Sequence, residues 1–124
     1  MKALVTGGAG FIGSNLSAAL LSKGFEVVVF DNFSTGSKEN LASLSLKVIK
    51  GDIMDTARLK EAARGADVVF HMAAQVGNVL SLQKPQENME INAIGTLNVL
   101  QACKDLGVKS VVYSSSCAIF GETK

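Results

Sequence analysis

Short apolar runs alternate with longer helical patterns along the chain. Five of these runs predict β-strands, and they cover residues 2–6, 26–31, 46–50, 68–71 and 109–114. Four are rich in Val, Ile and Leu and nearly continuous in apolar character, which is typical of strands covered on both faces. The run 46–50 carries two lysines, so we expect it at an edge of the sheet.

Helical patterns occupy the segments between the strands. Four helices are predicted, over residues 11–22, 38–42, 56–64 and 85–106. Gly24 and Gly107 supply stops after the first and the last of them. Asp55 is a predicted N-cap, and Pro85 suits the first turn of the long helix.

This alternation of strand and helix predicts an α/β fold of the Rossmann type. Right-handed crossovers favour a doubly wound parallel sheet of about five strands in the order 3-2-1-4-5. In such sheets a ligand binds at the carboxyl ends of the strands, where the winding reverses between strands 1 and 4. The residues that follow the strand ends are therefore the candidates for chemistry.

A glycine-rich segment, TGGAGFIG at residues 6–13, follows the first strand and opens the first helix. Its glycines fit G-x-G-x-x-G through Gly8 or G-x-x-G-x-x-G through Gly7, with Gly10 and Gly13 in both patterns. Either spacing puts backbone without a Cβ at a helix start, where free N–H groups and the positive dipole end accept a pyrophosphate. An ordinary tight turn is the alternative for the glycines alone.

Asp31 ends the second strand, eighteen residues after Gly13. A carboxylate at about this distance is the usual partner of a ribose 2′-hydroxyl, so the combination predicts dinucleotide binding. The carboxylate repels a 2′-phosphate, which favours NAD over NADP. Asp31 could also cap the loop over residues 32–36, alone or in addition.

Composition limits the class of protein. A chain of 124 residues suffices for one domain and not for two, and we expect residues 1–124 to form one cofactor-binding domain. Apolar residues make up 48% and charged residues 19%, which is typical of a globular protein. A net charge of +1 does not indicate binding to nucleic acid or to an acidic membrane.

Targeting and metal signals are not found in the sequence. We find neither a secretory signal nor an apolar stretch that approaches the ~18 residues of a membrane span. Cys103 and Cys117 are isolated, and His71 is the single histidine, so we expect no metal site. The cysteines suit a reduced, cytoplasmic protein, and His71 suits a structural role at the end of an apolar strand.

Six motifs occur in order along the whole chain: TGGAGFIG at 6–13, DNFSTG at 31–36, GDI at 51–53, HMAAQ at 71–75, NAIGT at 92–96 and YSSSCAIFG at 113–121. Together they resemble the extended short-chain dehydrogenase/reductase family, also called the NAD-dependent epimerase/dehydratase family. The likeness is greatest to UDP-glucose 4-epimerases and their nucleotide-sugar relatives. It covers only the amino-terminal part of such enzymes, so the sheet is expected to be truncated relative to the family.

The resemblance implies roles for the matched positions. The glycine loop and the backbone of Phe11 and Ile12 would contact the pyrophosphate. Residues after strands 2 and 3 would hold the adenosine, and residues after strand 4 would border the central and nicotinamide parts of NAD. The implied cofactor contacts are Gly7, Gly10, Phe11, Ile12, Gly13, Asp31, Asn32, Ser34, Thr35, Gly36, Asp52, Ile53, Met72, Ala73, Ala74, Gln75, Asn92 and Ser114. Asn92 could equally brace the loop after strand 4.

Ser116 matches the family's serine or threonine that binds the reacting sugar hydroxyl, so it is the implied catalytic residue. The family's base, the tyrosine of a Tyr-x-x-x-Lys motif, has no match, because Tyr113 is the one tyrosine and Cys117 follows it four positions later. We therefore expect the chain to be a fragment of a nucleotide-sugar epimerase or dehydratase. A non-catalytic NAD-binding module, one half of a split enzyme and a remnant without function are the alternatives. In the complete enzyme a nucleotide sugar would be the substrate, and the helix 85–106 could form a homodimer.

Overall fold

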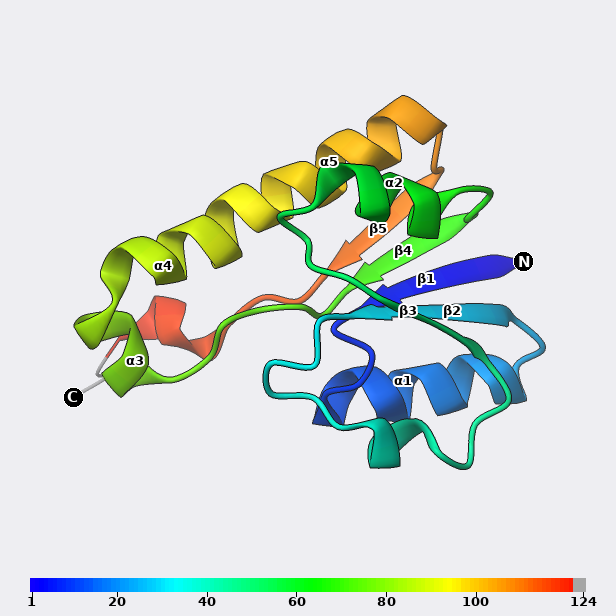
Figure 1. Cartoon of the computed structure of the whole chain (residues 1–124), viewed down its shortest axis with the longest axis horizontal. Helices are drawn as coiled ribbons and strands as arrows, with labels where there is room; N and C mark the ends of the chain where they lie inside the picture. Colours follow the sequence, from blue (N-terminus) through cyan, green and yellow to red (C-terminus); the bar gives the residue numbers. More distant parts are fainter. Residues whose placement is uncertain (122–124) are drawn as a thin grey trace.

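One parallel sheet forms the centre of the molecule (Figure 1). Within residues 1–121, which the computed structural model describes apart from the side chains of Cys117 and Ala118, the sheet has five strands in the order β3-β2-β1-β4-β5. The strands are β1 (Lys2–Thr6), β2 (Glu26–Asp31), β3 (Lys47–Lys50), β4 (Val68–His71) and β5 (Ser110–Tyr113). The predicted order 3-2-1-4-5 and the Rossmann-type α/β fold are confirmed.

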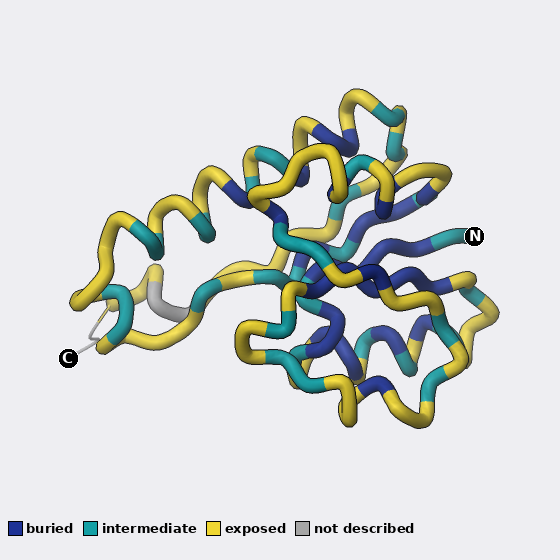
Figure 2. Tube along the Cα trace, in the orientation of Figure 1, coloured by how far each residue is buried: buried dark blue, intermediate teal, exposed yellow. Residues whose placement is uncertain are grey.

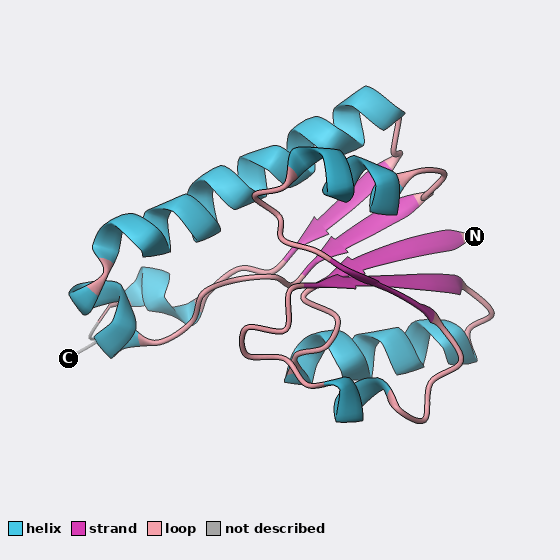
Figure 3. Cartoon of the chain, in the orientation of Figure 1, coloured by secondary structure: helices cyan, strands magenta, loops and turns pink. Residues whose placement is uncertain are grey.

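Helices cover both faces of this sheet (Figure 3). The helix α1 (Phe11–Ser22) and the 3-10 helix η1 (Lys38–Leu41) lie on one face. The helices α2 (Thr56–Ala63) and α5 (Gly95–Leu106) pack against each other on the opposite face.

Alternate residues of β1 enter different cores. Leu4 packs in the core under α2 and α5, whereas Ala3 and Val5 pack in the core under α1. A strand that is covered on both faces needs apolar residues at every position, which explains the near-continuous apolar runs of the sequence.

The loops that follow β1 and β4 leave the sheet at the same edge. The Gly7 N–H donates to the Phe30 carbonyl at 2.9 Å, and the Met72 N–H donates to the Thr6 carbonyl at 3.0 Å. These bonds extend the pairing of β1 by one residue on each side. The winding reverses between β1 and β4, so the loops border the crevice where ligands bind in folds of this kind.

The segment between β4 and β5 departs most from the predicted elements. The helices α4 (Pro85–Met89) and α5 are joined through a π-helical turn, η2 (Glu90–Ile94), so the predicted helix 85–106 contains an unpredicted π turn. The short helix α3 (Asn78–Gln83) was not predicted either. No residue of α3, α4 or η2 is buried, as Figure 2 shows. A helix without fully buried residues needs only a weak apolar stripe, and this stripe is the main sequence signal.

Smaller differences concern the ends of elements. The helix α2 ends at Ala63 because Arg64 adopts an extended conformation, with ψ of 123°. A 3-10 helix, η3 (Cys117–Phe120), follows β5. No helix in the described part of the chain is both long and apolar enough to pass through a membrane.

Candidate functional site

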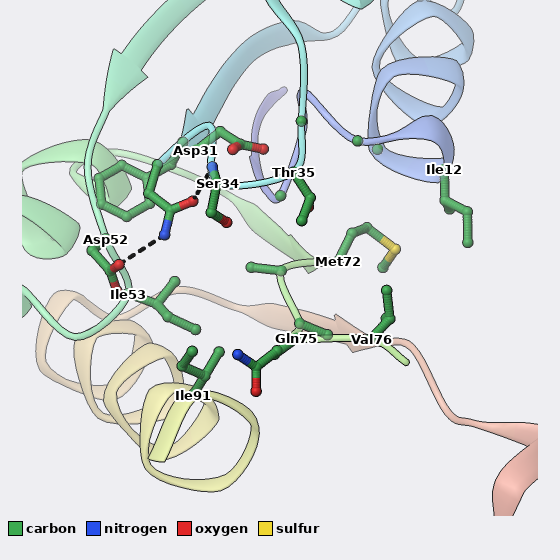
Figure 4. Close-up of a pocket in the computed structure, with 18 of the residues that line it drawn as sticks. Ile12, Asp31, Ser34, Thr35, Asp52, Ile53, Met72, Gln75, Val76 and Ile91 are labelled. Atoms are coloured by element: carbon green, nitrogen blue, oxygen red, sulfur yellow. Dashed lines mark hydrogen bonds between the residues drawn. The ribbon is translucent and has the colours of Figure 1, made fainter. Parts of the chain in front are cut away.

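A cavity of about 750 Å³ opens at the carboxyl ends of β1, β2, β3 and β4 (Figure 4). Its walls are the four loops that follow these strands, together with residues of α3, α4 and η2. The described residues that line it are Gly7, Gly10, Phe11, Ile12, Gly13, Phe30, Asp31, Asn32, Ser34, Thr35, Gly36, Gly51, Asp52, Ile53, Met72, Ala73, Ala74, Gln75, Val76, Leu80, Glu87 and Ile91. Three of these are acidic and none is basic.

The glycines of the loop after β1 differ in the space around them. Gly7 has a φ of +67°, and a Cβ there would lie 2.5 Å from the backbone N of Ala73. A Cβ at Gly13 would overlap the Gly7 carbonyl oxygen and lie 2.7 Å from the Cα of Gly8. At Gly10 the Gly7 carbonyl oxygen, at 3.3 Å, is the one described atom that would lie within 4 Å. Packing therefore requires glycine at positions 7 and 13, whereas Gly10 leaves space in the cavity.

Gly10 is also the N-cap of α1, and no side chain caps this helix. The first intrahelical bond runs from the Ser14 N–H to the Gly10 carbonyl at 3.0 Å. Phe11, Ile12 and Gly13 form the first turn and line the cavity. The cavity therefore borders a helix N-terminus, where unpaired N–H groups and the positive end of the dipole attract an anion.

Asp31 ties the glycine loop to the loop after β2. The side chain is buried, at 8% exposure. Its Oδ2 accepts the Ala9 N–H at 2.9 Å, and its Oδ1 accepts the Phe33 N–H at 2.8 Å. This is the capping role that the sequence left open. Each carboxylate oxygen keeps a lone pair, so the same group can also accept hydroxyl protons from a ligand.

The loops after β2 and β3 are joined in turn. The Asn32 amide donates to Asp52 Oδ2 at 2.8 Å, and Asp52 Oδ1 accepts the Met54 N–H at 2.9 Å. Beside this pair, Ile53 is buried against Gly95, where a Cβ would lie 2.9 Å from Ile53 Cγ1. A carboxylate and an apolar side chain therefore stand side by side at one end of the cavity (Figure 4), a pairing that suits a flat base with an exocyclic amine.

Asn92 clamps the backbone of the loop after β4. Its Oδ1 accepts the Gln75 N–H at 2.8 Å, and its amide donates to the Gln75 carbonyl at 2.9 Å. The Gln75 side chain donates to Glu87 at 2.9 Å, and Lys84 forms an ion pair with the same carboxylate at 2.9 Å. Hydrogen bonds from Lys84 and Gln75 lower the pKa of Glu87. The loop is thus held from α4 and η2, and the bracing role of Asn92 is the one observed.

His71 lies below this loop with 2% of its surface exposed. Its Nδ1 lies 2.6 Å from Thr6 Oγ1, and its Nε2 lies 3.0 Å from Thr96 Oγ1. The ring stacks on Tyr113, with centroids 5.7 Å apart. Burial lowers the pKa of His71 from its ordinary value of 6.5, so the ring is neutral at pH 7 and has the structural role expected from the sequence.

A family model described as NAD dependent epimerase/dehydratase matches residues 3–124. The chain belongs to this family. It is 39% identical to the UDP-glucose 4-epimerase of Corynebacterium glutamicum over 122 residues, which are 98% of this chain and 37% of that protein. The chain therefore spans well under half of the length of this relative.

Two solved structures of UDP-glucose 4-epimerases are similar to this member of the epimerase/dehydratase family. The UDP-glucose 4-epimerase of Thermus thermophilus, in complex with NAD, is 40% identical with a TM-score of 0.88, and the match covers 94% of this chain and 38% of that one. The UDP-glucose 4-epimerase of Thermotoga maritima, with UDP-glucose, is 35% identical with a TM-score of 0.93, covering 100% of this chain and 41% of that one.

The structure of this epimerase/dehydratase family member brings most of the predicted contacts together. Sixteen of the eighteen implied cofactor contacts line the cavity. Asn92 and Ser114 are not among the described lining residues, and neither is the implied catalytic residue Ser116. Ser114 and Ser116 are exposed beyond the end of β5. Among the residues that the structure describes, no cluster of His, Cys, Asp and Glu could hold a metal ion.

Sequence reasoning missed five lining residues: Phe30, Gly51, Leu80, Glu87 and Ile91. Phe30 and Gly51 adjoin predicted contacts, so their neighbours were the available signal. A Cβ at Gly51 would lie 2.5 Å from the Phe30 ring, which is a packing reason for that glycine. Leu80, Glu87 and Ile91 reach the cavity through α3, α4 and η2, and no short motif marks them.

Proposed function

We propose that the chain is the NAD-binding domain of a nucleotide-sugar epimerase or dehydratase resembling UDP-glucose 4-epimerase. The substrate-binding part of such an enzyme would lie outside residues 1–124. The observation that carries this proposal is the single cavity assembled from the loops after β1, β2, β3 and β4. It joins a helix N-terminus, two carboxylates and an apolar wall, which are the groups that a dinucleotide requires.

Each part of NAD is assigned to residues of the cavity. The N-terminus of α1 would take the pyrophosphate, with Gly10 leaving room for it. Asp31 would accept the hydroxyl groups of the adenine ribose, and Asp52 would accept the exocyclic amine of adenine beside Ile53. The loop over residues 72–76 would border the nicotinamide half. Ser34, Thr35 and Gly36 would close over the ribose.

NAD is favoured over NADP by the charges at the site. A 2′-phosphate needs a cation near the ribose, and no Lys or Arg is among the described lining residues. In this assignment Asp31 would face that phosphate and repel it. We expect calorimetry on the 124-residue chain to show binding of NAD and at least ~10-fold weaker binding of NADP.

The Asp31→Ala variant tests this assignment. Losing the charge-assisted hydrogen bonds to the ribose should weaken NAD binding by about 10-fold or more, and the advantage over NADP should narrow. The variant also loses the acceptor of two backbone N–H groups, so affinities are compared at a temperature where unfolding curves show it folded. Asp105→Asn, on the exposed surface of α5, is the control. Unchanged discrimination in Asp31→Ala would count against the ribose contact.

NAD, when bound, would supply the hydride acceptor for a sugar alcohol. Ser116 would steady the reacting oxygen, because one hydroxyl can donate to a ketone and accept from an alcohol. The chain lacks the Tyr-x-x-x-Lys pair that takes the alcohol proton in the family. We therefore expect the isolated chain to bind NAD weakly and to leave UDP-glucose unchanged, and turnover by the purified chain would contradict this.

A second candidate is a non-catalytic NAD-binding module or one half of a split enzyme, neither of which would need a Tyr-x-x-x-Lys pair in this chain. The sequence that follows Lys124 in the gene separates the possibilities. A continuous reading frame with Tyr-x-x-x-Lys soon afterwards supports the fragment of an epimerase or dehydratase, whereas a stop codon there supports the module or the split enzyme.

A homodimer through the helix 85–106 is also proposed. Met89, Leu97 and Leu100 expose 64%, 58% and 46% of their surfaces on this helix, which is apolar area that a second copy could cover. Sedimentation of the chain and of Leu97→Glu tests this, because a dimer through the helix dissociates in the variant and a dimer through another surface does not.

We place the protein in the cytoplasm, where isolated cysteines stay reduced, and cell fractionation tests that location.

A further inference from the structure

A chain of side-chain hydrogen bonds, buried at Thr6 and His71 and partly buried at Thr96, lies beneath the loop after β4. Thr6 Oγ1 lies 2.6 Å from His71 Nδ1, and His71 Nε2 lies 3.0 Å from Thr96 Oγ1. Thr6 and His71 expose 0% and 2% of their surfaces. This Thr6–His71–Thr96 chain joins the carboxyl ends of β1 and β4 to the first turn of α5.

The proton positions along the chain follow from the hydroxyl of Thr96. This hydroxyl donates to the Asn92 carbonyl at 2.7 Å, so it can only accept from His71 Nε2. A neutral imidazole with its proton on Nε2 has a bare Nδ1, which therefore accepts the Thr6 hydroxyl proton. Thr6 Oγ1 in turn accepts the Ala73 N–H at 3.4 Å. Every donor and acceptor is then used, with one tautomer of His71.

Both ends of the chain reach the same wall of the cavity. At one end, Thr6 holds Ala73 through its hydroxyl and Met72 through its carbonyl, at 3.0 Å. At the other end, Thr96 holds the Asn92 carbonyl within the π turn, and the Asn92 side chain clamps both backbone groups of Gln75. Three residues of the wall segment, Met72, Ala73 and Gln75, are thus fixed from below.

The π turn gives the hydrogen bond between Thr96 and His71 a structural role. A π turn leaves the regular i→i+4 ladder of an α-helix and usually marks a constrained site. In η2, Ile91 is partly buried against the core under α2 and α5, and no residue is fully buried, so side-chain hydrogen bonds also hold the turn in place. The hydroxyl of Thr96 supplies a tie from the turn to the buried ring of His71.

We propose that Thr96 and His71 are positioning residues, which hold the wall over residues 72–75 in the shape that receives the nicotinamide half of the cofactor. The inference rests on the proposed NAD-binding function. The inference concerns only one half of the cavity. The Thr6–His71–Thr96 chain acts on the loop after β4 and does not touch Asp31, Asp52 or the first turn of α1.

The test compares Thr96→Val, which keeps the shape but removes the hydroxyl, with Thr96→Ser, which keeps the hydroxyl. Calorimetry measures the affinity of each for NAD and for ADP, which carries the adenosine and pyrophosphate but no nicotinamide. We expect Thr96→Val to bind NAD ~3-fold to 10-fold more weakly, as loss of a buried hydrogen bond implies, with ADP binding unchanged. Thr96→Ser should bind both as the parent does, and Thr56→Val, on the exposed first turn of α2, controls for hydroxyl removal.

Equal loss of NAD and ADP binding in Thr96→Val, or no loss of either, would overturn the positioning role while leaving the proposed function intact. Failure of the parent chain to bind NAD would overturn both. Nitrogen NMR of His71 in the parent chain is a test that needs no variant: the proton should be on Nε2 at pH 7, and a proton on Nδ1 would overturn the arrangement. If Thr96→Val does not fold, Thr6→Val and Thr6→Ser repeat the comparison at the other end of the Thr6–His71–Thr96 chain.

Discussion

At the scale of single residues, the carboxylate and amide side chains at the strand ends hold backbone as well as facing a cavity. Asp31 accepts two N–H groups, and Asn92 holds both backbone groups of Gln75. The glycines and Asp31 were predictable because their spacing is local and follows directly from a strand end. Glu87 and Ile91 were not, because only the path of the helix 85–106 brings them to the cavity.

Gly10 and Gly13 should respond differently to alanine. A methyl group at Gly13 overlaps the backbone of the loop, so Gly13→Ala should destabilise the fold by about 1–3 kcal/mol, as overpacking does. Gly10→Ala meets one atom at 3.3 Å and has an unstrained φ of −74°, so the fold should keep its stability. Its methyl occupies the space proposed for the pyrophosphate, and NAD affinity should fall. Urea unfolding and calorimetry measure the two effects, and a stable Gly13→Ala or a fully binding Gly10→Ala would contradict this assignment.

His71 should make the stability depend on pH. Its pKa in the folded chain is lowered from 6.5 by burial, so the unfolded chain binds more protons below that pH and the free energy of unfolding falls with acidification. The contribution of His71 to the free energy of unfolding is complete above about pH 6.5. It is lost progressively as the pH falls toward the pKa of His71 in the folded chain. His71 is the single histidine, so His71→Gln should remove most of the slope between pH 7.5 and 5.5. If the free energy of unfolding of the variant has the same slope against pH, the pH dependence comes from other groups.

At the scale of elements, the strands and the core helices were predictable because each buries apolar residues with a clear period. The elements that were missed, α3 and the π turn η2, bury no residue. The π turn is held by polar ties, which are the Asn92 clamp on Gln75 and the bond between Thr96 and His71. Such ties link residues far apart in the sequence and leave no periodic pattern.

Two leucines in helices should separate these classes of element. Leu59 of α2 is 1% exposed in the core against the sheet and α5, so Leu59→Ala should cost about 2–5 kcal/mol of unfolding free energy. Leu82 of α3 is 83% exposed, so Leu82→Ala should change it by less than about 0.5 kcal/mol. Denaturant titration measures both, and similar costs at the two positions would show that α3 packs more closely than its exposure indicates.

At the scale of the whole molecule, the doubly wound sheet brings four loops together at one edge. The residues of these loops are spread over more than half of the chain. The strand order predicted from the sequence places them together before any side chain is considered. The family match over residues 3–124 agrees with this order. Ser114 and Ser116 lie beyond β5 and outside the cavity, so the cavity does not test the role proposed for Ser116.

The most direct measurement is a titration of the nitrogen-15-labelled 124-residue chain with NAD, followed by amide NMR. We expect the shifts to concentrate at residues 7–13, 31–36, 52–53 and 72–76, the four loops that line the cavity, and to saturate at lower concentration for NAD than for NADP. Amides on the far edge of the sheet, such as Gly24 and Gly65, should not move. Shifts that stay absent at millimolar NAD, or that gather away from these loops, would contradict the proposal that this cavity is a dinucleotide site.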